Sequence, residues 1–371
     1  PLSFTRPIAD FRIGIFTIRE KWEKYYKSVS VKTEGYLSDK FPIKQTKDNL
    51  WVSAKILPTK ILITELESLR IGEILEKNGD IIAFRSSVYD PDKLIRITTH
   101  VEVDSLENLC DIFNDNDREI KRDFSLITNS RTSQSLCEKN TILGNDIFIE
   151  KGAKVSCSIL NSESGPIYIG KNAEVMEGSI IRGPFSMGEN SVIKMGAKIY
   201  GATSLGPYCK VGGEVNNSVF FGYSSKAHDG FLGNSVIGEW CNLGADSNNS
   251  NLKNNYENVK IWNYNLERFK NTDLQFCGLI MGDHSKCGIN TMFNTGTVVG
   301  VSANVFGSGF PRNFIPSFSW GGAAGFSIYK LKKAFDVAEK VFVRRKLRFD
   351  NIEKNILTHV YNMTKRYRNE H

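Results

Sequence analysis

The sequence contains no apolar run long enough to cross a bilayer, and no basic segment followed by an apolar leader. We therefore expect neither a membrane span nor a secretory signal in these 371 residues. The seven cysteines include no Cys-x-x-Cys pair, and none has histidine neighbours at metal-finger spacing. A disulfide framework or a structural zinc site is therefore not expected, and the cysteines favour a reducing cytoplasm.

Acidic residues are scarce in the last part of the chain. From residue 330 onward twelve lysines and arginines stand against five acidic residues, an excess that equals the net charge of +7 of the whole chain. Nucleic-acid binding is one interpretation of such a segment. We favour a solvated helix face, or a positive rim that attracts a phosphorylated ligand, because a basic run without interleaved exposed aromatic residues is weak evidence for nucleic acid.

The first 135 residues are expected to form a mixed α/β domain. The polar stretch 129–140 marks its end. Apolar spacing predicts helices over residues 8–22 and 61–77, short strands over 49–56 and 81–85, and helix with turn over 106–127.

Beyond this boundary an internal repeat dominates the sequence. Apolar residues recur every six positions, and glycine directly follows several of them. The longest run has eight consecutive members: Ile169, Val175, Ile181, Met187, Ile193, Ile199, Leu205 and Val211. Shorter runs with the same period are Leu143, Ile149 and Val155, and later Met281, Cys287, Phe293, Val299 and Val305.

A six-residue period matches neither the 3.6-residue period of an α-helix nor the alternation of a strand. It fits a short strand plus a turn, three of which make one triangular coil whose aliphatic residues point inward. We therefore predict a parallel β-helix over residues 142–320, within a domain spanning 136–325. The period slips around residues 214–225, and a polar segment interrupts it over 246–276. Such insertions commonly build binding sites.

The last part of the chain, residues 326–371, is predicted to form one or two amphipathic helices. These helices are expected to cap the open end of the β-helix, whose last coil would otherwise expose unpaired strand edges.

Two of the five histidines are candidate bases. His228 lies between an irregular coil and the resumed repeat, where its imidazole would be partly exposed and able to take a proton from an amine or hydroxyl. A turn histidine without a role is the alternative. His284 is the second candidate, although Gly-Asp-His is an ordinary coil corner.

The segment from His228 to Ala245, HDGFLGNSVIGEWCNLGA, resembles the acetyltransferase half of a bacterial family. This family is the bifunctional UDP-N-acetylglucosamine pyrophosphorylase/glucosamine-1-phosphate N-acetyltransferase. There a catalytic histidine opens a stretch of the same length that continues into L-G-x-x-x-[VI]-G-x-x-x-N-I-G-A. The resemblance implies a left-handed β-helix, a homotrimer with sites between subunits, and His228 as the general base.

The resemblance also implies binding roles for residues beyond the histidine. Asn242, Gly244 and Ala245 fall on the family's Asn-x-Gly-Ala, with Gly244 and Ala245 beside acetyl-CoA. Asn251 falls on an asparagine of the acceptor and acetyl-CoA site.

Three positions depart from the family's pattern. Lys198 stands where the family has a phosphate-binding arginine, and it keeps the charge but loses the bidentate fork. Phe231 stands at an acceptor-site tyrosine, and Asn216 at a phosphate-binding lysine. The acceptor therefore need not be glucosamine-1-phosphate itself.

The N-terminal region resembles a divergent bacterial form of the same family, described as a sugar nucleotidyltransferase. The segments FTRPI, RIG, TIREKW, NLW and DFSLI carry this resemblance. A Gly-x-Gly-Thr-Arg phosphate loop is not visible, and only Thr5-Arg6 matches its end, which makes Arg6 a candidate substrate ligand. Because the region is also short for a complete nucleotidyltransferase domain, Mg²⁺ is expected only if this domain is active.

The predicted function is acetyl-CoA-dependent N-acetylation of an amino-sugar phosphate, with uridylyl transfer giving UDP-N-acetylglucosamine as a coupled activity. The expected partners are small molecules and two further copies of the chain. A non-catalytic hexapeptide-repeat scaffold or a sugar-nucleotide-binding regulatory protein is the alternative, and titration with acetyl-CoA separates it. A β-helix carbonic anhydrase would need three histidines around one zinc, and His228 and His284 supply two.

Overall fold

The computed structural model describes residues 1–368. The chain divides into two compact units, and each is described by itself. The β-helix unit comprises residues 1–5, 12–15 and the chain from 109 onward, and the N-terminal unit comprises residues 6–11 and 16–108.

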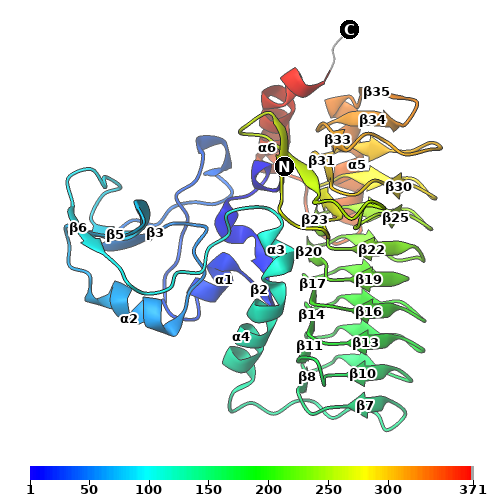
Figure 1. Cartoon of the computed structure of the whole chain (residues 1–371), viewed down its shortest axis with the longest axis horizontal. Coiled ribbons are helices and arrows are strands. Elements are labelled where there is room, and N and C mark those ends of the chain that lie inside the picture. Colours follow the sequence, from blue (N-terminus) through cyan, green and yellow to red (C-terminus); the bar gives the residue numbers. More distant parts are fainter. Residues whose placement is uncertain (369–371) are drawn as a thin grey trace. The chain divides into compact units, whose positions relative to one another are not determined.

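Three parallel sheets form the faces of a triangular column in the β-helix unit (Figure 1). The first face consists of β7 (Thr141–Leu143), β10 (Ile159–Asn161), β13 (Ile180–Arg182), β16 (Lys198–Tyr200), β19 (Glu214–Asn216) and β22 (Phe231–Gly233). The second face consists of β8 (Ile147–Ile149), β11 (Ile167–Ile169), β14 (Phe185–Met187), β17 (Thr203–Leu205), β20 (Val219–Gly222), β23 (Val236–Glu239), β28 (Leu279–Met281), β31 (Thr297–Val299) and β33 (Phe314–Ile315). The third face consists of β9 (Lys154–Val155), β12 (Glu174–Val175), β15 (Val192–Ile193), β18 (Lys210–Val211), β21 (Ser225–Lys226), β24 (Asn242–Leu243), β29 (Lys286–Cys287), β32 (Asn304–Val305), β34 (Ser319–Gly322) and β35 (Gly325–Ile328).

The register of these strands confirms the predicted period. Phe185 pairs with Thr203, which lies 18 positions later, so one coil contains three hexapeptides. Ser204 pairs with Val219, only 15 positions later, and this shortened coil lies where the period slips in the sequence. The fold class is the predicted one, a left-handed parallel β-helix with terminal helices.

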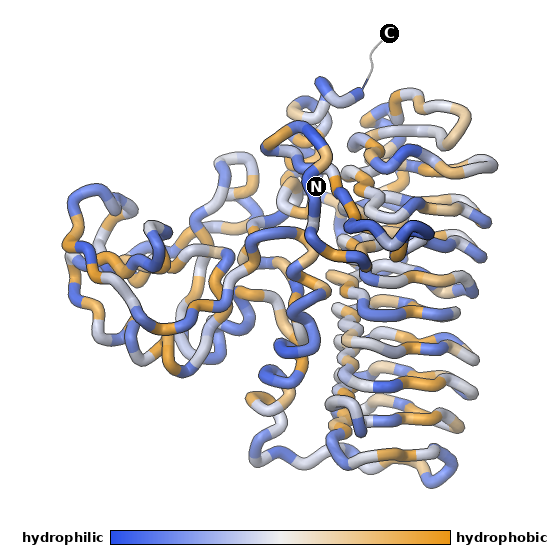
Figure 2. The backbone as a smooth tube through the Cα atoms, viewed as in Figure 1, coloured by the Kyte–Doolittle hydropathy of each residue, from blue (hydrophilic) through white to orange (hydrophobic). Residues whose placement is uncertain are grey.

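The residues that recur every six positions point into the column and form one continuous core. Ile169, Ile181 and Ile193 are fully buried, and Val175 and Val211 are buried beside them. Apolar colour returns in each coil of the stack in Figure 2. Because apolar burial contributes roughly 25 cal/mol per Å², this repeated column is the main stabilising feature of the unit.

The polar interruption of the period forms an excursion from one coil. β25 (Asn248–Asn249) still pairs in parallel with β30 (Met292–Phe293), so the coil continues past the predicted start of the insertion. The excursion then carries the antiparallel hairpin of β26 (Lys260–Asn263) and β27 (Arg268–Asn271).

The two helices that come directly before the repeat belong to the β-helix unit. This unit contains β1 (Arg12–Ile13), α3 (Asp111–Asn114) and α4 (Asn116–Thr128). The Asn116 amide donates to the Ala202 carbonyl at 2.7 Å and accepts from the Gly14 N–H at 2.7 Å. Gly14 has φ +74° and lies against α4, where an added Cβ would meet Asp123 Oδ2 at 2.4 Å. The units therefore do not divide at the boundary predicted near residue 135.

The two C-terminal helices form where they were predicted, as α5 (Leu331–Val343) and α6 (Asn351–Met363). They pack along the side of the column. Phe342 of α5 stacks on Trp240 at 4.1 Å between ring centroids, and Tyr361 of α6 meets Phe318 edge-on at 5.0 Å. The predicted cap over the end of the column is corrected accordingly, since β35 closes the third face by pairing antiparallel with β34.

The N-terminal unit contains a four-stranded mixed sheet in the order β3-β5-β4-β6. Its elements are α1 (Ile18–Trp22), α2 (Lys60–Ser68), β2 (Phe16–Thr17), β3 (Asn49–Val52), β4 (Glu73–Lys77), β5 (Asp80–Ser86) and β6 (Ile95–Thr98). The helix predicted over 8–22 begins only at Ile18, where Thr17 and Glu20 form a capping box. The helix predicted over 61–77 ends at Ser68, because the apolar residues after it belong to β4, which pairs with β5.

Candidate functional site

One corner of the β-helix, where the third face turns into the first, is built from small residues. We call it the open corner, and it comprises residues 194–197, 212–213, 227–230, 244–247 and 288–291. Its coils approach closely: a Cβ added at Gly212 would lie 2.7 Å from the Ala227 carbonyl oxygen, and one at Gly244 would lie 2.4 Å from the Gly288 carbonyl carbon. Glycine at these positions therefore lets successive coils stack closely, and the outer side of the corner forms a strip along the column on which His228, Asp229 and Asp246 are exposed.

His228 lies on this strip, two residues after β21, and it is exposed. Its carbonyl oxygen accepts a hydrogen bond from Lys226 Nζ at 2.7 Å. Within residues 1–368 its imidazole makes no hydrogen bond. An exposed, unengaged imidazole on a rigid coil is able to accept a proton from a bound amine.

The next coil of the open corner brings Gly244 and Ala245 beside the His228 loop. The Asp246 N–H donates to the Asp229 carbonyl at 3.0 Å, which fixes the two coils in contact. The Gly244 N–H already donates to the Cys287 carbonyl at 3.1 Å. If a backbone N–H here donates to a thioester oxygen, the amide of Ala245 is therefore a better candidate than that of Gly244.

Asn242 begins β24 and is exposed on the third face. The register places it between Ser225 and Lys286 on the neighbouring strands. Leu243, the next residue, is buried in the core, so Asn242 presents its amide on the outer surface just before the corner. This position lets it contact a molecule that lies along the strip.

Lys198 lies on the other side of the corner, at the start of β16 on the first face. It is exposed, and within residues 1–368 it makes no ion pair. Its neighbour in the register is Glu214, whose carboxylate accepts a hydrogen bond from the Tyr200 hydroxyl at 2.5 Å. Burial and this carboxylate raise the pKa of Tyr200 to about 12. The ammonium group of Lys198 is therefore available for an anionic ligand.

Phe231 and Asn251 come together around Gly233. A Cβ at Gly233 would meet the Phe231 ring at 2.6 Å and the Asn251 amide nitrogen at 2.7 Å. The Asn251 amide donates to Asn234 Oδ1 at 2.8 Å, and Phe231 follows Glu214 in the first-face register. Phe231 lies on the first face two strands beyond Lys198, and Asn251 follows β25, which pairs with β30 outside that sheet.

The structure does not bring His284 to this strip. His284 lies at the corner between the second and third faces, is 8% exposed, and stacks 6.1 Å from Phe342 and 6.3 Å from Trp240. Arg6 belongs to the N-terminal unit, where it is buried in the neighbourhood of Asp10. The proposal below therefore uses neither residue.

Two features near the strip were not predicted. Lys226 projects into the core, at the place where the period has an aliphatic residue. Arg312 lies at the last coil, beside a hollow of about 220 Å³ that is also lined by Ser319 and Ser327. The cation of Arg312 lies 5.3 Å from the centroid of the Phe326 ring. An arginine where the period ends is a sequence signal that could have found Arg312, whereas Lys226 follows the slip of the period, and only the register shows that it points inward.

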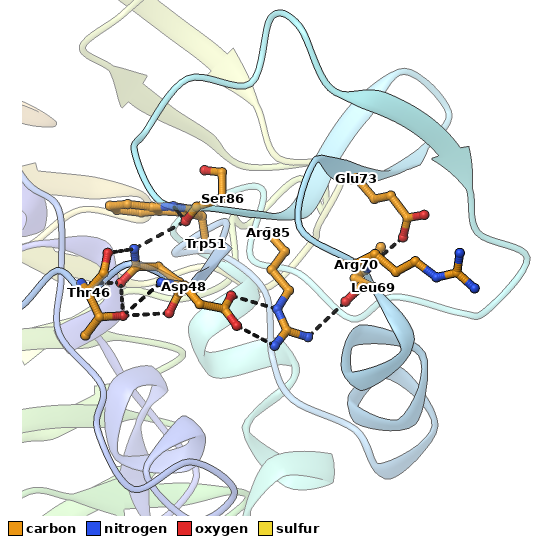
Figure 3. A network of polar contacts seen from close by, with 9 residues as sticks. Thr46, Asp48, Trp51, Leu69, Arg70, Glu73, Arg85 and Ser86 are labelled. Carbon is orange, nitrogen blue, oxygen red and sulfur yellow. Dashed lines mark hydrogen bonds and ion pairs between the residues drawn. The ribbon is translucent and has the colours of Figure 1, made fainter.

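A second hollow lies inside the N-terminal unit and has a volume of about 930 Å³. Trp22, Tyr26 and Trp51 are among the aromatic residues that line it, and the buried Tyr26 hydroxyl has no hydrogen-bond partner among residues 1–368. At its rim Arg85 binds both carboxylate oxygens of Asp48, at 2.8 and 2.7 Å (Figure 3). This bidentate contact lowers the pKa of Asp48.

The polar network in Figure 3 ties three elements of this unit together. Arg85 on β5 also donates to the Leu69 carbonyl, just after α2, at 2.9 Å. The Trp51 indole on β3 donates to the Ser86 carbonyl at 3.2 Å. These contacts are made within the unit, so they fix the rim of the hollow without a ligand.

Comparison with known families gives one match. Residues 1–132 match the family described as "Sugar nucleotidyl transferase". This match covers the N-terminal unit and the helices that follow it, and it supports the nucleotidyltransferase resemblance broadly.

Two curated archaeal proteins resemble part of the chain. The "Bifunctional protein GlmU" of Methanocaldococcus jannaschii is 33% identical over 87 residues, which are 24% of this chain and 21% of that protein. The protein of the same name from Methanococcus aeolicus is 30% identical over 87 residues, 24% of this chain and 20% of that protein. The chain thus spans about a fifth of the length of the curated relatives it matches.

Solved structures with a similar outline are acyltransferases. The Arabidopsis UDP-N-acetylglucosamine acyltransferase shares 14% identity, with 62% of this chain and 89% of that chain covered and a TM-score of 0.29. AntD, an N-acyltransferase from Bacillus cereus solved with dTDP and 3-hydroxybutyryl-CoA, shares 15% identity over 55% and 90%, with a TM-score of 0.23. At these sequence identities and TM-scores, the ligands of those enzymes say nothing about what this chain binds or transfers.

Residues 1–368 contain neither a candidate membrane span nor a cluster of metal-binding side chains. No described helix is long and apolar enough to span a bilayer. No group of three or more His, Cys, Asp or Glu side chains in that range is arranged to hold a metal ion.

Proposed function

We propose that the β-helix unit is an acyl-CoA-dependent N-acyltransferase that acts on a phosphorylated or nucleotide-linked amino sugar, with acetyl as the acyl group. One observation carries the proposal: an exposed histidine with an unengaged imidazole lies on the strip of the open corner between an unpaired lysine and a run of Gly and Ala. The resemblance of residues 228–245 to an acetyltransferase motif supports it.

The chemistry assigned to the open corner is acyl transfer from a thioester. The amine nitrogen attacks the thioester carbonyl carbon while His228 takes the amine proton. The carbon–sulfur bond then breaks, and the thiolate leaves and recovers a proton from the imidazolium. Proton transfer by a placed base contributes about 10²–10⁴ in rate. The Ala245 N–H would donate to the developing oxyanion.

The two substrates would approach the corner from different sides. Lys198 on the first face would bind the phosphate of the acceptor, with Phe231 beyond it on the same face and the Asn251 amide beside Gly233 of that strand. Gly244 and Ala245 would let the thioester arm lie against the backbone, and Asn242 would contact its amides.

The phosphate groups of the acyl-CoA would bind at the far end of the column. β34 is four strands from β21 along the third face, a distance of roughly 19 Å at the usual strand spacing. Arg312 beside this strand is exposed and, within residues 1–368, makes no ion pair. A cation at this position suits the phosphate groups of the acyl-CoA, because the long arm of that molecule separates them from the reacting thioester.

A trimer is part of the proposal. Ile159 and Ile180 are neighbours in the register of the first face and are 37% and 47% exposed. Lys198 is the next residue of the same ladder. Another copy that covered this apolar pair would bring its own surface beside Lys198, so the site would lie between subunits. Mass measurement in solution tests this part directly.

The second candidate activity belongs to the N-terminal unit. The sugar nucleotidyl transferase match and the hollow of about 930 Å³ with an unpartnered Tyr26 hydroxyl support binding of a sugar nucleotide there. Uridylyl transfer in this unit would require Mg²⁺.

The test is incubation of the protein with acetyl-CoA and a panel of amino-sugar phosphates and nucleotide-linked amino sugars. UTP and Mg²⁺ are added in a separate arm. We expect a product heavier by one acetyl group in the first arm. A panel without any acetylated product, together with no acetyl-CoA binding by calorimetry, would leave the scaffold interpretation in place.

A further inference from the structure

One lysine lies inside the apolar column. Lys226 ends β21 and is 1% exposed, although it carries the charge of an ammonium group. The register places it beside Val211 of the preceding coil. Val211 belongs to the buried core of the column, and so does Leu243 of the following coil. Lys226 thus takes a position that the repeat elsewhere fills with an aliphatic side chain.

The ammonium group of Lys226 reaches from the core to the back of the open corner. Its Nζ donates to the His228 carbonyl at 2.7 Å and to the Gly212 carbonyl at 3.0 Å. These two carbonyls belong to consecutive coils of the corner. The single side chain therefore joins the loop that carries the candidate base to the coil below it.

We propose that Lys226 is a positioning residue for acyl transfer: it fixes the backbone of the 227–230 loop from inside the column and so sets where the His228 imidazole lies. The inference rests on the proposed function of the open corner.

The placement of this charge has a thermodynamic cost that packing alone does not explain. An ammonium group in apolar surroundings loses its hydration, and burial lowers the pKa of Lys226 to about 8. A methionine or leucine would fill a similar volume without this cost. What only the lysine supplies is a pair of strong hydrogen bonds to the corner.

The loop that it holds has little else to fix it from within. Gly213, with φ +70°, is pressed against the loop, and a Cβ there would lie 2.8 Å from the His228 carbonyl oxygen. Asp229 is exposed, and its carbonyl accepts the Asp246 N–H at 3.0 Å. The histidine side chain itself makes no hydrogen bond in residues 1–368, so its position follows that of its own backbone.

A second lysine in the chain provides a matched control. Lys286 Nζ donates to the His284 carbonyl at 2.9 Å, the same kind of contact, and burial lowers its pKa as well. It holds the corner at which His284 is stacked on aromatic rings, and its neighbour in the register is Asn242. Replacement of Lys286 therefore removes a half-buried lysine that makes the same kind of contact at the other corner, two strands from β21 along the third face.

The experiment compares K226M with K286M in the full chain. For K226M we expect kcat to fall about 10- to 100-fold while KM for acetyl-CoA and for the acceptor stays within twofold, because misplacement of a base affects the chemical step. For K286M we expect kcat within twofold of wild type; its KM for acetyl-CoA is not part of the control, because Lys286 is the register neighbour of Asn242. An unchanged kcat in K226M, or an equal loss in K286M, overturns the proposal.

Hydrogen exchange of the same variants gives a readout that needs no activity. In K226M the amides of residues 227–233 should exchange at least tenfold faster, with the remaining coils unchanged. Should wild type show no acyl transfer, the proposed function fails, and exchange alone decides whether Lys226 fixes the loop. Unchanged exchange at residues 227–233 overturns the inference in either case.

A second variant keeps the test decisive if K226M does not fold. Glutamine is one atom shorter than lysine and cannot reach both carbonyls, yet it retains a donor. For K226Q we expect reduced kcat with both KM values unchanged. A K226Q protein with the kcat of wild type overturns the proposal.

Discussion

Two corners of the same column carry a histidine, and they differ in what covers them. The corner between the second and third faces, which we call the covered corner, stacks Tyr208, Tyr223 and Trp240 at 5.1 and 4.2 Å. Phe342 of α5 continues this stack over Trp240, and His284 follows it. At the open corner the corresponding strip contains several Gly and Ala residues and no aromatic ring besides the imidazole, and nothing within residues 1–368 stacks on His228.

The two corners show that the repeat fixes the backbone of the column but does not decide which corner packs against a helix. Both histidines have a carbonyl held by a lysine, at 2.7 Å for His228 and 2.9 Å for His284. Large rings at the covered corner give α5 a surface to pack on, because stacked aromatic pairs add to their buried area. Glycine at the open corner lets the coils stack closely, and no ring or helix packs over His228 within residues 1–368.

The sharpest test of this comparison exchanges the two histidines for alanine in turn. H228A should lower kcat about 10²–10⁴-fold without changing the unfolding midpoint, because an exposed base is removed. H284A should retain kcat and lower the unfolding midpoint, because a buried ring is lost. Steady-state kinetics and denaturant unfolding measure both. Loss of turnover in H284A alone would reverse the assignment of the two corners.

The second prediction concerns the aromatic stack itself. W240A should destabilise the β-helix unit by about 3–5 kcal/mol, because Trp240 is buried between Tyr223 and Phe342. Activity per folded molecule should stay near that of wild type. Denaturant unfolding followed by kinetics on the folded fraction gives the result. A cost below 1 kcal/mol would show that α5 does not depend on this surface.

The third prediction uses the buried lysine as a pH probe. The pKa of Lys226 is about 8 in the folded protein, against an ordinary value of 10.5. Between these values the unfolded chain binds the proton more tightly, so the free energy of unfolding rises with pH across the window. Wild type should gain about 3 kcal/mol relative to K226M between pH 7 and 10. Parallel pH curves for the two proteins would contradict this.

The smallest effects are expected where ligands meet exposed cations. K198A should raise KM for the phosphorylated acceptor about tenfold and leave KM for acetyl-CoA unchanged. R312A should do the opposite, with a several-fold rise for acetyl-CoA. Initial rates with each substrate varied in turn measure both. The same substrate affected in both variants would mean that the two cations do not serve different ligands.

The sequence was sufficient to predict the column, because its signal is long and periodic. Eight apolar residues from Ile169 to Val211 follow one another at intervals of six positions and mark one inward position per short strand. Neither a helix nor an alternating strand has this period. The helices found within 8–22 and 61–77 are shorter than predicted. In the second of these segments, apolar residues near Ile74 can belong to a strand as well as to a helix. Pairing with β5, a contact distant in sequence, decides between them.

The candidate site was predicted less completely than the fold. His228, Gly244 and Ala245 come together because their motif spans adjacent coils of the predicted column. Lys226 could not be predicted in its present role. Sequence places a lysine in surface positions by default, and only the register shows that it lies between Val211 and Leu243. Packing of α5 along the covered corner depends on aromatic contacts that no repeat encodes.

The antiparallel direction of β35 limits the addition of further coils to the column. A stack of parallel coils could in principle accept further coils, and identical molecules could then grow into a fibre. β35 instead runs opposite to β34, so the last edge of the third face presents the hydrogen-bond pattern of an antiparallel pair. The third face is thereby closed to a further parallel coil at this end of the column.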